Sequence, residues 1–429
     1  MTGPKVGLAL WTKLIPESEI RRLLKYKVKY YFAGGKPGVL PLGAFPMILS
    51  TLALEELEDI FSGREVDVIE DYNYGPTAGL PEVRKVMAGI MRERDGINLD
   101  PEEGWKEVVI TTGSQQAIHL LLDVLLNPDD LVIVPAPVYL GFVNVVTKFR
   151  GQVIAVPGDK QGMIPEYVDK AIEKAISKFG RKPKLIYVVA DSDNPSGTTM
   201  PESRRRALLD VAKDKGIYLV EDAAYREIQF RGERLRPIRT FDEDGSTVIY
   251  MRTTSKEVAV LRVGYNLMPP EIREEVVKAK GYNDLCTPTI TQKIAKVYYE
   301  KYFAQFIGKV REGYRKRYEA MAKAIDEEFP DGERTDPTGG FFIWWEAPKK
   351  DFDSKRFLEE VAIPNDVIYV PGQSFYPLKG YLFHPESEDF MDSANRPTHT
   401  MRLSYSYMEP EDIEAGIRKL GSLLRDYLS

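Results

Sequence analysis

The chain has 429 residues, of which 43% are hydrophobic and 29% charged, and its net charge is −6. This length predicts roughly two or three domains with a core that needs no disulfide or metal. The single cysteine, Cys286, excludes a disulfide framework and a cysteine-rich zinc site. The acidic balance argues against nucleic acid as the main partner. There is no run of about 18 apolar residues and no long apolar signal-peptide core, so we expect a cytoplasmic protein without a membrane span.

The N-terminal residues 1–45 are expected to form an arm that joins the small domain, and a Pro/Gly-rich stretch from Gly34 to Pro46 leads into the large domain. From about residue 105, apolar strands alternate with helices. The strands are predicted at Val108–Thr111, Leu131–Pro135, Gln152–Val156, Lys184–Ala190, Ile217–Glu221 and Val248–Met251. The helices between them are predicted at Gln115–Leu126, Pro165–Lys178 and Glu202–Lys215. This alternation indicates a mostly parallel sheet that is covered by helices on both faces.

The pattern changes after about residue 270. A long helical region is predicted over Glu271–Glu328, and a final helix begins at Glu409. Strand-like segments lie between them at Gly340–Trp345, Val367–Val370 and Thr400–Tyr405. We therefore expect a large domain over residues 46–305 and a smaller α+β domain over residues 306–429.

Ligands of open parallel sheets bind beyond the carboxyl ends of the strands, so the residues that follow each strand are the candidates for a site. Ser114 and Gln115 follow the first strand and open a helix, where free N–H groups and the helix dipole suit a phosphate. The later strands are followed by an aromatic, an amide, a carboxylate, a phenol and a lysine: Tyr139, Asn194, Asp222, Tyr225 and Lys256. Taken singly, these residues have ordinary explanations as turns, helix caps or a solvated lysine.

Taken in order, the same residues describe one ligand. A helix N-terminus, hydroxyl groups and an arginine would hold a phosphate, and Tyr139 would stack on a flat ring. Asp222 would supply a carboxylate for a ring nitrogen, and Asn194 and Tyr225 would contact a ring oxygen. Lys256 would form an imine with an aldehyde. These are the requirements of pyridoxal 5′-phosphate.

The chain resembles the class I/II aminotransferases of PLP fold type I over nearly its whole length. The segments that carry the resemblance are SEIRRLLK (18–25), FAGGKP (32–37), YGPTAGLPEVR (74–84), TTGSQQA (111–117), PAPVYLG (135–141), DNPSGTTM (193–200), VEDAAY (220–225), TTSKEVAVLRVGY (253–265), GGFFIW (339–344), YVPGQSF (369–375) and THTMRLSYS (398–406). It is most similar to the branch of 2-aminoadipate, kynurenine and archaeal aromatic aminotransferases. The resemblance implies a large domain with a mostly parallel seven-stranded sheet between helices, a smaller α+β domain, and pyridoxal phosphate as cofactor.

The resemblance also implies roles for individual residues. Lys256 matches the lysine that binds the cofactor covalently and moves a proton, and Asp222 matches the carboxylate that keeps the ring nitrogen protonated. Tyr225 and Asn194 match the ligands of the ring oxygen O3′, and Tyr139 matches the stacking aromatic. The phosphate cup is matched by Ser114, Gln115, Thr253, Ser255 and Arg262.

For the substrate, Arg402 matches the arginine that takes the α-carboxylate, with Asn194 nearby, and Gly35 matches a backbone contact. Tyr74 matches a tyrosine that reaches the phosphate of the neighbouring subunit, which implies a homodimer with shared sites. Arg21 matches an arginine that some relatives use for a side-chain carboxylate, although an ordinary exposed helix residue is an equal alternative.

The chain departs from the family pattern in three places. The loop from Lys256 to Arg262 is shorter than usual, which leaves open whether Arg262 reaches the phosphate. The segment Asp191–Asp193 stands where relatives often carry an apolar run. An insert over Gly380–Pro397, expected in the small domain, would reshape the substrate entrance. The histidines show no ligand spacing, so no metal site is expected.

The leading hypothesis is an aminotransferase that moves an amino group by a ping-pong mechanism. The donor would be an aromatic amino acid, 2-aminoadipate, glutamate or a similar amino acid, and the acceptor a 2-oxo acid such as 2-oxoglutarate. The alternative is a PLP-dependent lyase or decarboxylase, because one fold supports several reactions. A PLP-fold transcription regulator would need an added DNA-binding domain, and only about 45 residues precede the large domain.

Overall fold

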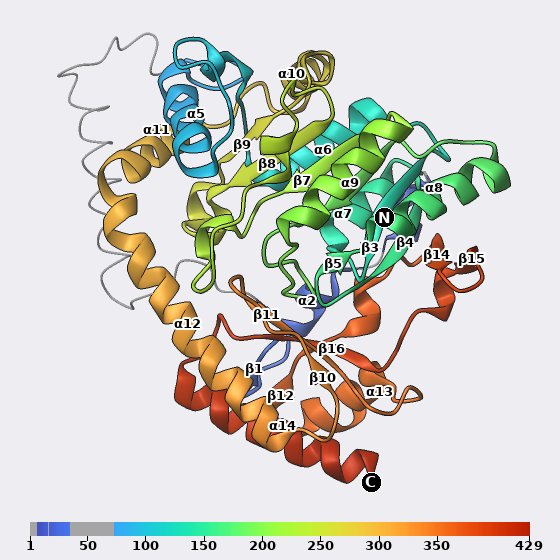
Figure 1. Cartoon of the computed structure of the whole chain (residues 1–429). Helices are drawn as coiled ribbons and strands as arrows, with labels where there is room; N and C mark the ends of the chain where they lie inside the picture. Colours follow the sequence, from blue (N-terminus) through green and yellow to red (C-terminus); the bar gives the residue numbers. More distant parts are fainter. Residues whose placement is uncertain (1–6, 16, 35–72) are drawn as a thin grey trace, which may run out of the picture.

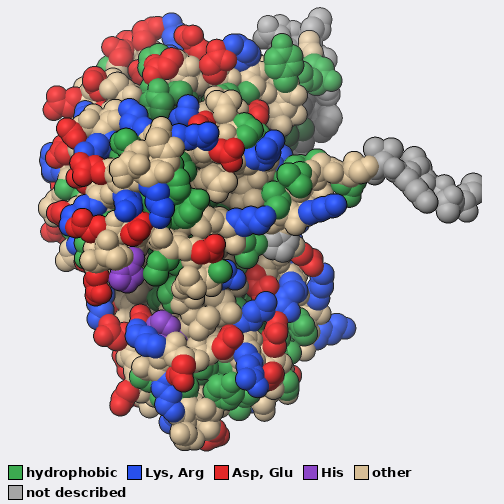
Figure 2. Space-filling view, turned by 90° about the vertical axis from the view of Figure 1, so that its right-hand side faces the viewer, with side chains coloured by type: hydrophobic (Ala, Val, Ile, Leu, Met, Phe, Trp, Pro, Cys, Tyr) green, Lys and Arg blue, Asp and Glu red, His purple; other side chains and the backbone are tan. Residues whose placement is uncertain are grey.

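The computed structural model describes residues 7–15, 17–34 and 73–429. Figure 1 shows a large domain built around a sheet, with a smaller domain below it. Helix α12 (Phe303–Glu328) runs from the large domain along the side of the small one. Acidic and basic side chains intermingle over the face seen in Figure 2. Among the described residues, no helix is both long and apolar enough to span a bilayer.

The large domain contains a ten-stranded sheet in the order β15-β14-β4-β3-β6-β7-β8-β9-β2, with β5 paired to β4 off this path. Its strands are β2 (Val109–Thr111), β3 (Leu131–Ala136), β4 (Gln152–Asp159), β5 (Gly162–Met163), β6 (Leu185–Val188), β7 (Tyr218–Asp222), β8 (Val248–Thr253), β9 (Gly264–Leu267), β14 (Tyr381–His384) and β15 (Asp389–Asp392). The run from β4 to β2 is the expected mostly parallel core, in which β9 pairs antiparallel with both neighbours. The predicted fold type is therefore confirmed, with strands added at one edge.

Helices cover both faces of this sheet, because each face is apolar. On one face, α6 (Gly113–Leu125), α7 (Leu140–Lys148) and α10 (Pro270–Asn283) share a core with β3 and β8. On the other face, α8 (Pro165–Phe179) and α9 (Glu202–Lys215) pack on the alternate residues of β3, β6 and β7. Helix α5 (Pro81–Asp95) and α11 (Thr289–Val297) pack at the β9–β2 edge. This layering leaves the carboxyl ends of the strands free to form a site.

The insert over residues 380–397 lies on the large sheet and not in the small domain, which corrects our expectation. Strand β14 pairs in parallel with β4, and β15 forms the outer strand of a hairpin. The rings of Phe179, Tyr381 and Phe390 pack together beneath this hairpin. The insert therefore covers the edge of β4, where unpaired backbone groups would otherwise be exposed.

The small domain is built on a four-stranded sheet in the order β10-β11-β16-β13. Its strands are β10 (Glu333–Arg334), β11 (Phe342–Glu346), β13 (Val370–Pro371) and β16 (Thr400–Ser404), and they pack on α12 and on α14 (Pro410–Leu428). Helix α13 (Ser354–Phe357) and strand β12 (Val367–Ile368) complete the domain. The N-terminal strand β1 (Tyr30–Tyr31) pairs with β12, so residues far apart in sequence share this core.

Two short helices, one against each domain, precede β1. Helix α1 (Trp11–Leu14) lies against α7, and the Lys148 ammonium group sits 5.6 Å from the centre of the Trp11 ring. Helix α2 (Glu19–Leu23) follows it. After α1, which lies on the large domain, the chain passes through α2 to β1 in the small domain.

Candidate active site

A cavity of about 620 Å³ lies at the carboxyl ends of the large-domain strands, between α2 and the small domain. Most of the residues predicted from the sequence line it: Arg21, Ser114, Gln115, Tyr139, Asn194, Asp222, Tyr225, Thr253, Ser255, Lys256, Arg262 and Arg402. Their side chains come from widely separated segments that the parallel sheet brings to one edge. The structure therefore assembles the predicted constellation in one place.

Lys256 follows β8 at the end of a short 3₁₀ turn. Its Nζ lies 5.0 Å from the centre of the Tyr225 ring, and it has no hydrogen-bond partner among the described residues. Burial lowers the pKa of Lys256 to about 8, and the nearby carboxylate of Asp222 opposes that shift. A larger fraction of this lysine is consequently a neutral amine at neutral pH, which is the form that attacks an aldehyde.

Asp222 ends β7 and is 4% exposed. Its Oδ2 accepts a hydrogen bond of 3.0 Å from the hydroxyl of Tyr187, whereas its Oδ1 is buried without a partner among the described residues. Burial raises the pKa of Asp222 to about 6, although the Tyr187 hydroxyl, Lys256 and the backbone N–H of Ala224 lower it. A buried acceptor without a donor is costly, so this oxygen is placed for a ligand N–H group.

Tyr187 is a site residue that the sequence analysis missed. It lies on β6, lines the cavity and stacks on Phe142 with ring centres 4.0 Å apart. Its hydroxyl fixes one oxygen of Asp222, whereas the other oxygen is buried without a partner among the described residues. In the sequence it is one aromatic residue in an apolar strand, a pattern that cannot be told from core packing.

Tyr139 is held at the cavity wall by a chain of hydrogen bonds. Its hydroxyl donates to Oε1 of Gln115 at 2.9 Å, and Nε2 of Gln115 donates to the carbonyl of Gly141 at 3.1 Å. A Cβ atom on Gly141 would lie 2.3 Å from the Tyr139 ring, so this position requires glycine. The ring is therefore fixed in position beside the cavity, as a stacking role requires.

The predicted phosphate cup forms around the N-terminus of α6. Nη1 of Arg262 donates to Oγ of Ser255 at 2.5 Å, and the hydroxyl of Thr253 donates to the same oxygen at 2.9 Å. A Cβ atom on Gly113 would lie 2.6 Å from Nη2 of Arg262. The short loop after Lys256 thus still delivers Arg262 to the helix N-terminus, and Arg262 adopts a left-handed φ of 53° to do so.

Arg402 lies on β16 of the small domain and is 1% exposed. Its guanidinium group sits between the rings of Phe342 and Phe375, 4.0 and 4.7 Å from their centres. It donates to Oδ1 of Asn194 and to the carbonyl of Ala33, and its Nε has no partner in the described parts of the chain. Burial lowers the pKa of Arg402 to about 10. A planar cation held this rigidly suits a carboxylate.

Comparison with known proteins identifies the family. The model of the family "Aminotransferase class I and II" matches residues 65–420. The chain belongs to this family. It is 34% identical to aromatic-amino-acid aminotransferase 1 of Thermococcus litoralis, over 95% of this chain and 92% of that protein. It is 31% identical to the 2-aminoadipate transaminase of Thermus thermophilus, over 97% and 96%.

A solved structure supports the same assignment. Pyrococcus horikoshii kynurenine aminotransferase, solved in complex with PMP, matches with a TM-score of 0.85 at 31% identity, over 98% of both chains. The protein is therefore an aminotransferase of fold type I and not a lyase or decarboxylase, and its cofactor is pyridoxal 5′-phosphate. The described residues fit this cofactor, because Asp222 offers an unpartnered oxygen and Lys256 a free amine.

Of the remaining predicted residues of the aminotransferase, Tyr74 does not line this cavity. Tyr74 is 77% exposed and lies outside the cavity wall of its own chain. Gly35 lies outside the described residues. The roles expected for these two residues remain predictions.

Arg21 lines the cavity from α2 and has no ion-pair partner among the described residues. Its neighbour Arg22 instead donates to Glu19 at 2.6 Å and to Glu359 at 3.0 Å. Lys25 likewise pairs with Glu17. Arg21 is thus the uncompensated cation of the aminotransferase's N-terminal helix.

Proposed function

We propose that this aminotransferase takes amino acids with a distal carboxylate, such as glutamate or 2-aminoadipate, and aromatic amino acids as donors. The acceptor is a 2-oxo acid such as 2-oxoglutarate, in a ping-pong reaction. The observation that carries the first part is Arg21, a cation without a partner at the cavity wall. The names of the relatives, which include an aromatic-amino-acid aminotransferase and a 2-aminoadipate transaminase, support the same substrate range.

The residues of the cavity have different roles in the reaction. When bound, pyridoxal phosphate supplies an aldehyde that binds amines and a ring that accepts electrons. Lys256 would hold the aldehyde carbon until the substrate amine displaces it, and its released amine would then accept the proton of the substrate Cα, for which its lowered pKa is suited. Asp222 keeps the ring nitrogen protonated through its free Oδ1. Tyr139 stacks on the ring.

Other residues orient the two ends of the substrate and cofactor. Arg402 binds the substrate α-carboxylate with its fork of donors, and Asn194 and Tyr225 donate to the ring oxygen O3′. The cup at the N-terminus of α6 holds the phosphate; its members are Ser114, Gln115, Thr253, Ser255 and Arg262. Gly35 contributes a backbone contact to the substrate.

The test of substrate class compares two adjacent arginines. Arg21→Ala should lower kcat/KM for glutamate roughly tenfold to a hundredfold, which corresponds to a loss of about 1.5–3 kcal/mol in transition-state stabilisation. The kcat/KM for phenylalanine should change little. Arg22→Ala is the matched control, because Arg22 pairs with Glu19 and Glu359 and does not line the cavity. An equal effect of Arg21→Ala on both substrates, or none on either, would remove Arg21 from substrate recognition.

We further propose a homodimer in which Tyr74 reaches the phosphate of the partner's cofactor. Tyr74 is exposed in the single chain, and apolar side chains near the same end of the large domain are exposed as well, among them Val260 at 64% and Tyr282 at 92%. Exposed apolar groups of this size favour an interface. Mixed dimers of Tyr74→Phe and Lys256→Ala chains should regain activity, since one of their two sites is intact. Inactive mixed dimers, formed from parents that fold, would contradict shared sites.

The domain boundaries at residues 45 and 305 and the cytoplasmic location remain proposals that rest on the sequence. Limited proteolysis should cut first near residue 45, because few contacts cross a domain linker, whereas residue 305 lies within α12 and should resist cleavage. If cleavage occurs only in other loops, the domain boundaries lie elsewhere.

A further inference from the structure

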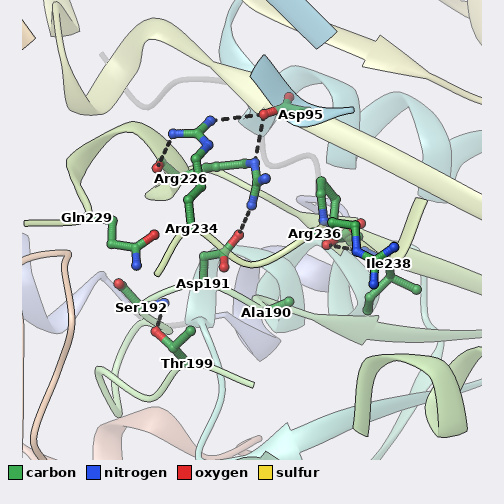
Figure 3. A network of polar contacts seen from close by, with 12 residues as sticks. Asp95, Ala190, Asp191, Ser192, Thr199, Arg226, Gln229, Arg234, Arg236 and Ile238 are labelled. Atoms are coloured by element: carbon green, nitrogen blue, oxygen red, sulfur yellow. Dashed lines mark hydrogen bonds and ion pairs between the residues drawn. The ribbon is translucent and has the colours of Figure 1, made fainter. Parts of the chain in front are cut away.

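A network of buried ion pairs includes residues that adjoin two of the cavity-lining segments in sequence. Its acceptors are the carboxylates of Asp95, Asp191 and Glu227, which are 2%, 5% and 2% exposed. Its donors are six arginines, each from a different element or loop: Arg94, Arg205, Arg226, Arg234, Arg252 and Arg311. Figure 3 shows Asp95, Asp191, Arg226 and Arg234 of this network.

Arg226 joins two parts of the network. Its Nε donates to Oδ1 of Asp95 at 2.7 Å, and its Nη1 donates to Oδ2 of Asp191 at 2.9 Å. The Arg226 side chain is 3% exposed, so water does not screen either pair. In Figure 3, the guanidinium group of Arg226 lies between the two carboxylates.

The two ends of this link are close in sequence to two site residues. Asp191 comes three positions before Asn194, and Arg226 directly follows Tyr225. Asn194 and Tyr225 both line the cavity. The Arg226–Asp191 pair therefore ties together the two segments that carry the O3′ ligands.

Neither segment is held by a strand ladder at this point. Strand β6 ends at Val188 and β7 at Asp222. Ser192 has a left-handed φ of 51°, and its backbone N–H donates to the hydroxyl of Thr199 at 3.1 Å. Side chains thus have to fix the relative position of the two segments, and a planar arginine that bridges two carboxylates is suited to this.

We propose that Arg226 and Asp191 are positioning residues that set the spacing between Asn194 and Tyr225. This inference rests on the proposed function, in which these two side chains donate to the ring oxygen O3′. Both donors must reach one oxygen, so a small change in the spacing of their segments weakens at least one hydrogen bond. A buried ion pair adds little net stability, although the removal of one partner is costly, so what this pair contributes is mainly geometry.

The test uses the holoenzyme and reads the visible absorbance of the lysine-bound cofactor as the pH is raised. Hydrogen bonds donated to O3′ lower its affinity for the proton that it shares with the Lys256 nitrogen. Arg226→Lys keeps the charge but cannot bridge both carboxylates. It should raise the pH of the absorbance change by at least ~0.5 units. The matched control is Arg94→Lys, because among the described residues Arg94 donates to Glu227 but not to Asp191 or to the backbone of the Arg226 segment.

Arg94→Lys should leave the pH of the absorbance change within ~0.2 units of wild type, even if both variants melt at lower temperature. Equal shifts in the two variants, or no shift in Arg226→Lys, would overturn the proposal. Wild-type protein without an absorbance band that titrates, or without cofactor on Lys256, would instead contradict the proposed function.

A measurement on the wild-type chain covers the case in which Arg226→Lys fails to fold. Amide hydrogen exchange is compared between the cofactor-free protein and the holoenzyme. Residues 191–197 and 222–228 should gain protection together, because the pair joins them into one unit. Protection of one segment without the other would also overturn the proposal.

Discussion

The cofactor cavity and the network of buried ion pairs are built from the same kinds of buried charged side chains, but these side chains are partnered differently. In the cavity, Oδ1 of Asp222 and Nε of Arg402 have no partner among the described residues. In the network, both oxygens of Asp191 are taken, one by Arg205 and one by Arg226. The carboxylate in the cavity thus keeps one oxygen open for a ligand, whereas the Asp191 carboxylate in the network has both oxygens occupied.

The pKa values of the two aspartates follow this difference. Both are buried, and burial alone raises the pKa of a carboxyl group. The pKa of Asp222 is raised to about 6, since burial outweighs one phenol and a lysine. The pKa of Asp191 falls well below its usual range, because Arg205 and Arg226 outweigh the same burial. The two acids are equally buried but differently partnered, and their pKa values therefore differ. Asp222 is suited to a reaction, and Asp191 to holding the structure.

The largest expected effect is on stability, in Asp191→Asn. This change leaves the guanidinium groups of Arg205 and Arg226 buried without their carboxylate, and we expect a loss of about 3–5 kcal/mol in the free energy of unfolding. Urea unfolding at neutral pH measures it. The deficit should shrink in strong acid, because a lowered folded-state pKa gives stability that is lost as the pH falls. A variant as stable as wild type would contradict the bracing role.

The next effect is on catalysis, in Asp222→Asn. The amide cannot stabilise the charge of the ring N–H, so the barrier in kcat should rise on the order of 2–4 kcal/mol. Stacking and phosphate contacts do not depend on this carboxylate, so cofactor should remain bound. Single-turnover kinetics with equal cofactor occupancy measures the change. Near-normal turnover would refute the role of Asp222.

When cofactor is absent, the same substitution, Asp222→Asn, should stabilise the protein at neutral pH. Because the pKa of Asp222 rises on folding from 3.8 to about 6, its contribution to stability is present at low pH and is lost as the pH rises through that value. Cofactor-free Asp222→Asn should therefore be more stable than wild type above pH ~6, on the order of 2 kcal/mol, and equal to it near pH ~4. Thermal unfolding at both pH values tests this. If the variant is less stable than wild type at both pH values, Oδ1 of Asp222 has a partner in the cofactor-free protein.

The smallest effect is expected in Tyr187→Phe. The ring still packs on Phe142, but Oδ2 of Asp222 loses the hydroxyl that donates to it at 3.0 Å. The barrier should rise by about 1 kcal/mol, the value of one hydrogen bond. A further tenfold loss when Tyr187→Phe is added to Asp222→Asn would mean that the phenol acts independently of Asp222.

The sequence predicts the cavity better than the network, for a physical reason. A residue such as Lys256 or Asp222 follows a strand end, and parallel strands bring their ends together, so the neighbours of that residue can be inferred. Asp95 is the last residue of α5, and Arg226 meets it only through the tertiary fold. No local pattern marks such a pair.

The same limit applies to parts of the fold. Residues 140–148 form α7, which the prolines before them obscured, and the short strand β9 was not predicted. The insert was placed in the small domain because it lies there in sequence, yet β14 pairs with β4. Pairing between distant strands is decided by which edge is free, and the sequence does not show that edge.

The account depends most directly on Lys256 as the residue that holds the cofactor. Borohydride reduction of the holoenzyme, followed by digestion and peptide mapping, should place the pyridoxyl group on Lys256. Lys280 is a fitting internal control, because its side chain is 0% exposed but pairs with Asp284 outside the cavity. A pyridoxyl group on Lys280 or on any lysine other than Lys256 would contradict the assignment of the site.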